Sequence, residues 1–174
     1  MPFSMSQASL VPFTTGLNAL TAILDKAAAF AAARKIDPAV LIHSRLAPDM
    51  FDFTRQVQAV TDQVRRGAAR LAGVESPVYE DNETTIDQLK ARLGKTIAFL
   101  ETLDRAKIDA SADRDIAFPL GGGATGNMKG TDYLDLFVLP NYYFHLTAAY
   151  AILRHNGLEI GKRDFLGAIP IRRT

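Results

Sequence analysis

The sequence has no cysteine among its 174 residues. Disulfide bonds, thiolate metal sites and thiol nucleophiles are therefore excluded. The absence fits a reducing compartment, so we expect the protein in the cytoplasm. Histidine is also scarce, because only three residues are scattered along the chain. Three scattered imidazoles indicate at most a weak metal site.

An excess of one charge is missing too, since 20 basic and 19 acidic side chains leave a net charge of +1. The longest basic clusters are the pairs Arg65–Arg66 and Arg172–Arg173. A dedicated nucleic-acid surface needs a concentrated basic field, so we expect no nucleic-acid partner.

Long uninterrupted apolar runs are absent near the N-terminus, where Thr14, Asn18 and Asp25 break them. We therefore expect neither a signal peptide nor a membrane span. The composition is otherwise that of a globular protein, with 48% hydrophobic residues. A chain of this length forms one core, which predicts a single domain over residues 1–174.

Apolar residues recur at spacings of three and four over several stretches, which is typical of amphipathic helices. The predicted long helices cover residues 6–34, 50–72, 86–100 and 131–156. Pro12 either kinks the first of them or marks its first turn. Asp37 and Pro38 form a cap and first-position pair, which predicts a short helix over residues 38–46.

Capping signals place several helix ends. Thr85 with Gln88 three residues later has the form of a capping box. Thr131 is the predicted cap of the last long helix. Gly73 and Gly157 stand where the second and last long helices are expected to end.

Residues 114–129 differ from the rest, because Ile116, Phe118 and Leu120 alternate before three glycines. This predicts a small β-hairpin or an ordered loop. We expect an extended tail over residues 158–174, with 168–174 disordered. The predicted fold is all-α, an antiparallel four-helix bundle with the hairpin or loop before the last helix.

The helix 131–156 carries a polar pair on its apolar stripe. At 100° per residue, Asn141 and His145 lie on the same line as Leu134, Val138, Ala148 and Ile152. Two such side chains one turn apart either share a metal or hydrogen-bond to each other and to a buried water. They are the main candidate site residues.

Other polar motifs have simpler explanations. His43 and His155 are predicted to be surface or capping residues. The glycines of residues 121–126 lack the lysine and the strand-to-helix context of a phosphate-binding loop. Ser44, Ser76 and Ser111 lack the context of a nucleophile elbow, so nothing supports serine hydrolysis.

The opposite face of the helix 131–156 is apolar as well, with Leu136, Leu139, Tyr143 and Tyr150. A face of this kind is normally covered. The N-terminal segment, the hairpin or a second copy of the chain is expected to cover it. We predict a homodimer, and the alternative is an interaction module that binds another protein through this face.

Several segments resemble one protein family. The last long helix, HLTAAYAILRHNG over residues 145–157, is similar to the last helix of DinB-like bundles. RLAPDMFDFTRQVQ (45–58), LPNYYFH (139–145) and LRHNGLEIGKRDFLG (153–167) resemble an uncharacterised bacterial family within that superfamily. The resemblance spans residues 4–167.

This resemblance implies a four-helix bundle and, in many relatives, a divalent metal held by three histidines. Some relatives are thiol-dependent transferases or isomerases. The second histidine of the relatives' HxxxH pair corresponds to His145, whereas the first corresponds to Asn141. The second long helix has no histidine, and Gln56 is the nearest polar residue there. Carboxamides are weaker ligands than imidazoles for zinc or nickel.

These observations predict a bundle that binds a small molecule in a polar pocket formed by Gln56, Asn141 and His145. No catalytic residue is assigned and no cofactor is expected, with His145 as a weak candidate for a divalent metal. The alternative activity is a metal-dependent thiol S-transferase or isomerase, in which His145 binds the metal.

Overall fold

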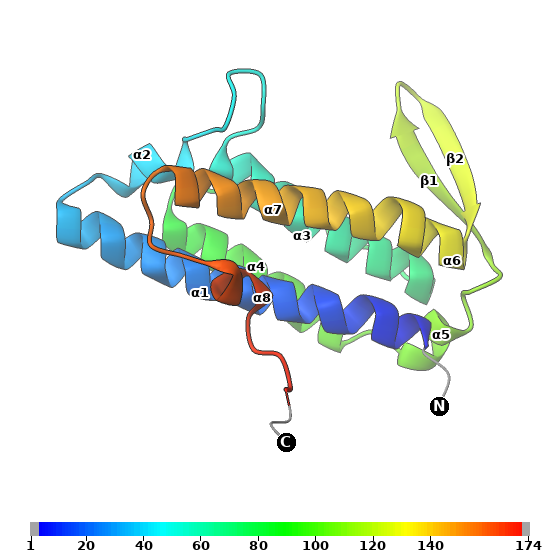
Figure 1. Cartoon of the computed structure of the whole chain (residues 1–174). Helices are drawn as coiled ribbons and strands as arrows, with labels where there is room; N and C mark the ends of the chain where they lie inside the picture. Colours follow the sequence, from blue (N-terminus) through cyan, green and yellow to red (C-terminus); the bar gives the residue numbers. More distant parts are fainter. Residues whose placement is uncertain (1–3, 172–174) are drawn as a thin grey trace.

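The computed structural model describes residues 4–171, and Figure 1 shows a mainly helical molecule with one small hairpin at one end. A mainly helical fold with a two-stranded antiparallel sheet is therefore confirmed. The elements in chain order are α1 (Met5–Arg34), α2 (Pro38–Ile42), α3 (Phe53–Ala72), α4 (Ile86–Glu101), α5 (Arg105–Asp109), β1 (Asp115–Gly121), β2 (Ala124–Lys129), α6 (Gly130–Asp132), the π-helical turn η1 (Tyr133–Val138), α7 (Leu139–His155) and α8 (Lys162–Leu166).

Local sequence signals set most helix ends as expected. Thr85 and Gln88 form the predicted capping box at α4, and Gly73 ends α3 at a φ of 69°. Gly157 follows α7 with a φ of 89°. Pro12 lies inside α1, beyond its first turn, so the first-turn interpretation was wrong. The short helix α2 ends at Ile42 instead of residue 46.

The start of the last long helical segment differs from the prediction. Helical structure begins at Gly130, and the Thr131 hydroxyl donates to the carbonyl of Ala112 instead of capping the helix. The reason is a close backbone contact, because a Cβ at position 130 would lie 1.9 Å from the Ser111 carbonyl oxygen. Only glycine fits there, and this contact fixes where the chain turns from β2 into the helix.

Helices α3 and α7 pack antiparallel and make the most extensive helix contact of the described chain. Gln56, near the start of α3, meets His145 of α7, and Arg70, near the end of α3, meets Tyr133 in η1. Arg70 donates to the Tyr133 hydroxyl at 3.0 Å. This pair of helices brings the candidate site residues together.

Two other neighbouring pairs are parallel, so the predicted antiparallel arrangement was only partly right. Phe13 and Phe30 of α1 meet Tyr142 and Gly157 in the same order along α7. Helices α3 and α4 also run in the same direction (Figure 1). The connection over residues 74–85 makes this possible, because it returns the chain from the end of α3 to the start of α4.

The core lies between α1, α3, α4 and α7, and its helices approach closely at two glycines. A Cβ at Gly16 would lie 1.9 Å from the Tyr142 hydroxyl oxygen, and one at Gly67 would lie 2.6 Å from a methyl carbon of Val138. Both contacts involve the last long helix. The small residues at these two positions let the last long helix pack closely against α1 and α3.

The C-terminal segment is not the extended tail that we predicted, because it contains α8. Lys26 of α1 forms an ion pair with Asp164 at 2.6 Å, and the Phe165 ring packs edge-on against Tyr150 at 5.7 Å between centroids. This segment covers the Tyr150 end of the outer face of α7. The predicted disorder of 168–174 extends into residues 172–174, which lie outside the described residues.

By length and composition, Gly130–His155 is the one helical segment within residues 4–171 that could cross a membrane. Core helices of water-soluble proteins often have the same composition. Here Tyr142, Leu146 and Ile152 are buried in the protein core. Leu136, Tyr143 and Phe144 of the same segment are exposed, so burial against other helices accounts for only part of its apolar composition.

Candidate functional site

Gln56 of α3 and His145 of α7 meet as a hydrogen-bonded pair. The Gln56 Oε1 atom lies 2.8 Å from Nδ1 of His145. Gln56 is only 1% exposed. His145 is half-buried. Two of the three predicted site residues are thus in direct contact.

The surroundings of Gln56 fix the tautomer of His145. The Gln56 Nε2 group donates to the Phe51 carbonyl oxygen at 3.4 Å, and a carbonyl can only accept. The amide is therefore oriented with its Oε1 toward the imidazole. His145 must donate from Nδ1, so in the neutral ring the Nε2 atom carries a lone pair.

Two partly exposed aromatic side chains flank the imidazole. Phe51 stacks on His145 with 6.2 Å between ring centroids, and Phe144 packs edge-on at 5.2 Å. The Arg55 guanidinium lies over the Phe51 ring, 5.6 Å from its centroid. Burial lowers the pKa of His145 below its usual 6.5, and the positive charge of Arg55 lowers it further. The ring is accordingly neutral at neutral pH.

Asn141 does not join this pair. Its Nδ2 group donates to the Phe137 carbonyl oxygen at 2.7 Å, one turn back along the helix. Asn141 and His145 therefore do not satisfy each other, although they are one turn apart as expected. Polar side chains in helices often bond in this way to the carbonyl four residues back.

A cavity of about 440 Å³ lies beside this pair, between α7 and the segment that precedes α3. Leu46 and Met50 line one side, and Tyr143, Phe144 and Thr147 line the other. Phe144 thus has its edge toward His145 and also forms part of the cavity wall. Gln56, Asn141 and His145 do not line this cavity themselves.

Comparison with known proteins identifies the family. The model of the family called "Domain of unknown function (DUF1993)" matches residues 5–166. The chain belongs to the DUF1993 family. The crystal structure of a DinB family member protein from Shewanella denitrificans is similar, with a TM-score of 0.89 and 41% identity over 96% of this chain and 94% of that chain. No curated protein matches the sequence. The predicted resemblance is therefore confirmed.

The residues of this DUF1993 protein do not fit the three-histidine metal site of the wider superfamily. The amide of Gln56 is used by His145 and Phe51, and that of Asn141 by its own helix. Three nitrogen or oxygen donors therefore do not converge on one point. Within residues 4–171, no group of three His, Cys, Asp or Glu side chains is placed to hold a metal ion.

A buried network of charged residues was missed by the sequence analysis. Asp62 and Arg65 of α3 and Arg92 of α4 are each no more than 8% exposed. Asp62 Oδ1 accepts from Arg65 at 2.8 Å and from Arg92 at 3.0 Å. The available signal was position, because Arg92 lies on the apolar stripe of α4, between Leu89 and Thr96.

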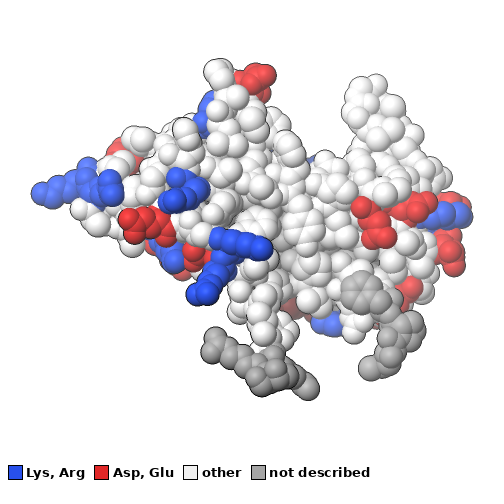
Figure 2. Space-filling model, in the orientation of Figure 1, with Lys and Arg blue, Asp and Glu red and all other residues white. Residues whose placement is uncertain are grey.

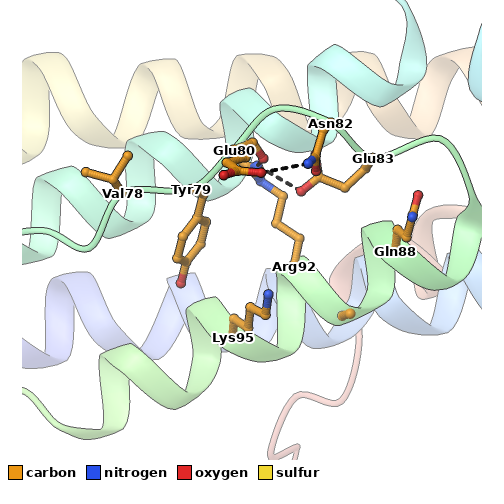
Figure 3. Close-up of a pocket in the computed structure, with 9 residues that line it drawn as sticks. Val78, Tyr79, Glu80, Asn82, Glu83, Gln88, Arg92 and Lys95 are labelled. Carbon is orange, nitrogen blue, oxygen red and sulfur yellow. Dashed lines mark hydrogen bonds and ion pairs between the residues drawn. The ribbon is translucent and has the colours of Figure 1, made fainter.

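This network ties the 74–85 connection to α3 and α4. Arg92 donates to the Glu80 carbonyl at 3.1 Å and to the Glu83 carboxylate at 3.0 Å, and both arginines lie over the Tyr79 ring. Figure 3 shows Arg92 reaching from α4 to the connection beside a cavity of about 430 Å³. The Arg92 guanidinium is fully used by protein acceptors, so we interpret this network as structural.

Proposed function

We propose that this DUF1993 protein is a four-helix-bundle protein of the DinB type that binds a small planar molecule at His145. The hydrogen bond between Gln56 Oε1 and His145 Nδ1 carries this proposal, because it leaves Nε2 as a fixed acceptor. The ligand donates an N–H or O–H group to this atom. The surrounding rings of Phe51 and Phe144 favour an aromatic or heteroaromatic body.

The cavity between α7 and the segment before α3 provides room for the body of the ligand. Its lining is mainly apolar, with Leu46, Met50 and Tyr143 among its side chains. Phe51 is 48% exposed. A rotation of Phe51 or Phe144 would connect the cavity with His145, and side-chain rotation of exposed residues is fast.

The test is a binding screen with heteroaromatic N–H compounds, read by thermal shift and by calorimetry. We expect a hit to bind the wild type and to lose about fivefold or more in affinity in His145→Ala, because one hydrogen bond to a neutral group is worth about 1 kcal/mol. His155→Ala is the matched control, since His155 is exposed on the same helix. Hits that bind both variants equally would overturn the proposal.

We also propose a homodimer through the outer face of η1 and α7. Leu136 is 68% exposed, Phe144 59% and Tyr143 43%. Residues 139–153 contain no Asp, Glu, Lys or Arg, and Figure 2 shows charged groups toward the ends of this face and few over its middle. Light scattering tests the proposal, because a mass of 19.0 kDa at micromolar concentration would contradict it.

A further inference from the structure

A second cavity lies on the other side of α7, between α1, α7 and α8. Its volume is about 410 Å³, within the usual range for small-ligand sites. Tyr142 and Leu146 form its floor together with Gly16, and Phe165 and Ile169 close it from the C-terminal segment. Figure 1 shows α8 lying across α1 beside α7. We call this cavity the α8 groove.

The α8 groove is held open by contacts that anchor α8 at one side. Asp164 pairs with Lys26, and the Phe165 ring packs against Tyr150. The apolar residues at the opposite rim remain accessible, since Val11 is 52% exposed and Ile169 45%. Tyr142 in the floor lies directly against α1, because Gly16 leaves space for its hydroxyl. This hydroxyl donates to the Pro12 carbonyl at 3.1 Å.

Pro12 leaves a backbone acceptor in the wall of the groove. In an α-helix the carbonyl of residue 8 accepts from the N–H of residue 12, but proline has no N–H. Ala8 and Pro12 both line the groove, and α-helical geometry directs the Ala8 carbonyl toward Pro12. Within residues 4–171, no side chain donates to it. The Gln7 amide and the Thr15 and Tyr143 hydroxyls add three further polar groups.

The groove has no charged residue in its lining. A charged ligand would lose its hydration there without gaining an ion pair, whereas a neutral ligand would not. We infer that the α8 groove binds a neutral amphipathic molecule, with an apolar chain or ring over Tyr142 and Leu146 and a hydroxyl or amide donor on the Ala8 carbonyl. This site shares the Tyr143 side chain with the cavity beside His145 but does not include His145 itself.

The test compares 1-octanol with octanoate, using NMR amide shifts and calorimetry on the full chain. We expect saturable binding of 1-octanol with shifts in α1 and α7 along the groove, and at least about tenfold weaker binding of octanoate. His145→Ala should bind 1-octanol unchanged, which separates this inference from the proposed function. Equal affinity for the two compounds, or no saturable binding of 1-octanol, would overturn it.

Two variants sharpen the result. Val11→Trp fills the groove from an exposed position and should abolish octanol binding, while Val40→Trp on α2 should not. Pro12→Ala supplies the missing N–H to the Ala8 carbonyl, so we expect unchanged or higher thermal stability together with severalfold weaker octanol binding. Octanol affinity that is the same in Val11→Trp and in the wild type would contradict the assignment of the site.

Discussion

Gln56 and His145 are 89 positions apart in the chain, and a single hydrogen bond makes them one unit. The buried amide has no freedom to reorient, because its other end is held by the Phe51 carbonyl. A carboxamide in this place cannot take or release a proton. It therefore sets the tautomer of the imidazole without changing the charge of the site.

The pKa of His145 gives a first prediction. Because the folded-state pKa lies below 6.5, the unfolded chain binds more protons between these two values, and the free energy of unfolding should fall as pH falls through this window. Gln56→Glu places a carboxylate beside the ring, so we expect an NMR titration to show a raised pKa for His145. A pKa that stays the same in Gln56→Glu would show that the pair is not formed in solution.

Metal affinity gives a second prediction at this scale. The donors of the wild type do not converge, so we expect no saturable binding of zinc or nickel in calorimetric titrations. Gln56→His combined with Asn141→His places three imidazoles on the facing helices α3 and α7, and this variant should gain stoichiometric metal. Adding His145→Ala should remove the gain. Tight metal binding by the wild type would contradict the conclusion that Gln56, Asn141 and His145 do not form a metal site.

At the scale of helices and their connections, the buried ion network holds an otherwise irregular segment in place. Asp62 is shared by the buried Arg65 and Arg92 and by the exposed Arg66. The arginines differ greatly in exposure, with 54% of the Arg66 side chain exposed and 2% of Arg92. Equal contact distances near 3.0 Å therefore correspond to unequal energies.

Single replacements of Arg92 and Arg66 compare the energy of a buried ion pair with that of an exposed one. Arg92→Met removes a buried partner from both Asp62, which keeps Arg65 and Arg66, and Glu83, which keeps only the Gln58 amide. We expect the free energy of unfolding to fall by about 3 kcal/mol. Arg66→Ala removes only an exposed partner of the same carboxylate and should cost less than about 1 kcal/mol. Urea unfolding measures both. Similar losses for the two variants would mean that the network is open to water.

The close approach of α1 to α7 depends on Gly16. Gly16→Ala would push its Cβ into the Tyr142 hydroxyl, which is buried and hydrogen-bonded, so we expect a loss of about 1–3 kcal/mol in the free energy of unfolding. Gly94→Ala is the matched control, because no atom lies within 4 Å of its added Cβ. That variant should be stabilised by about 0.5–1 kcal/mol. Denaturant midpoints that move in the same direction would contradict this account.

At the scale of the whole molecule, the last long helix separates three surfaces. One side forms the core with α3 and α1, a second faces the α8 groove, and the outer side carries exposed apolar residues. The C-terminal segment covers part of the outer side through Phe165. Leu136 and Phe144 stay exposed, which is the basis of the proposed dimer.

A charge on the outer side tests that dimer. If the face is an interface, Leu136→Asp should convert a dimer into a folded monomer, because an unpaired charge is costly to bury between subunits. Light scattering gives the mass, and circular dichroism confirms that the variant remains folded. Val78→Asp is the control, since Val78 is 92% exposed on the 74–85 connection. An unchanged mass for Leu136→Asp would place the contact elsewhere.

The sequence by itself determined the four long helices and most of their ends, because these depend on local periodicity, on capping residues such as Thr85 and on glycines such as Gly73. For residues 114–129 it left a hairpin and an ordered loop open, and it did not predict α5. It also located His145, through its position on the apolar stripe of the last long helix. Helix α8 escaped notice because a helix of five residues has too little periodicity to detect.

Only the tertiary structure decided which polar groups meet. The directions of α3, α4 and α7, and their rotation about their own axes, bring Gln56 to His145 and Arg92 to Asp62. The same packing leaves Asn141 bonded to its own helix. These outcomes depend on contacts between residues far apart in the chain, and the spacing of residues along a single helix does not specify its rotation to within one side chain.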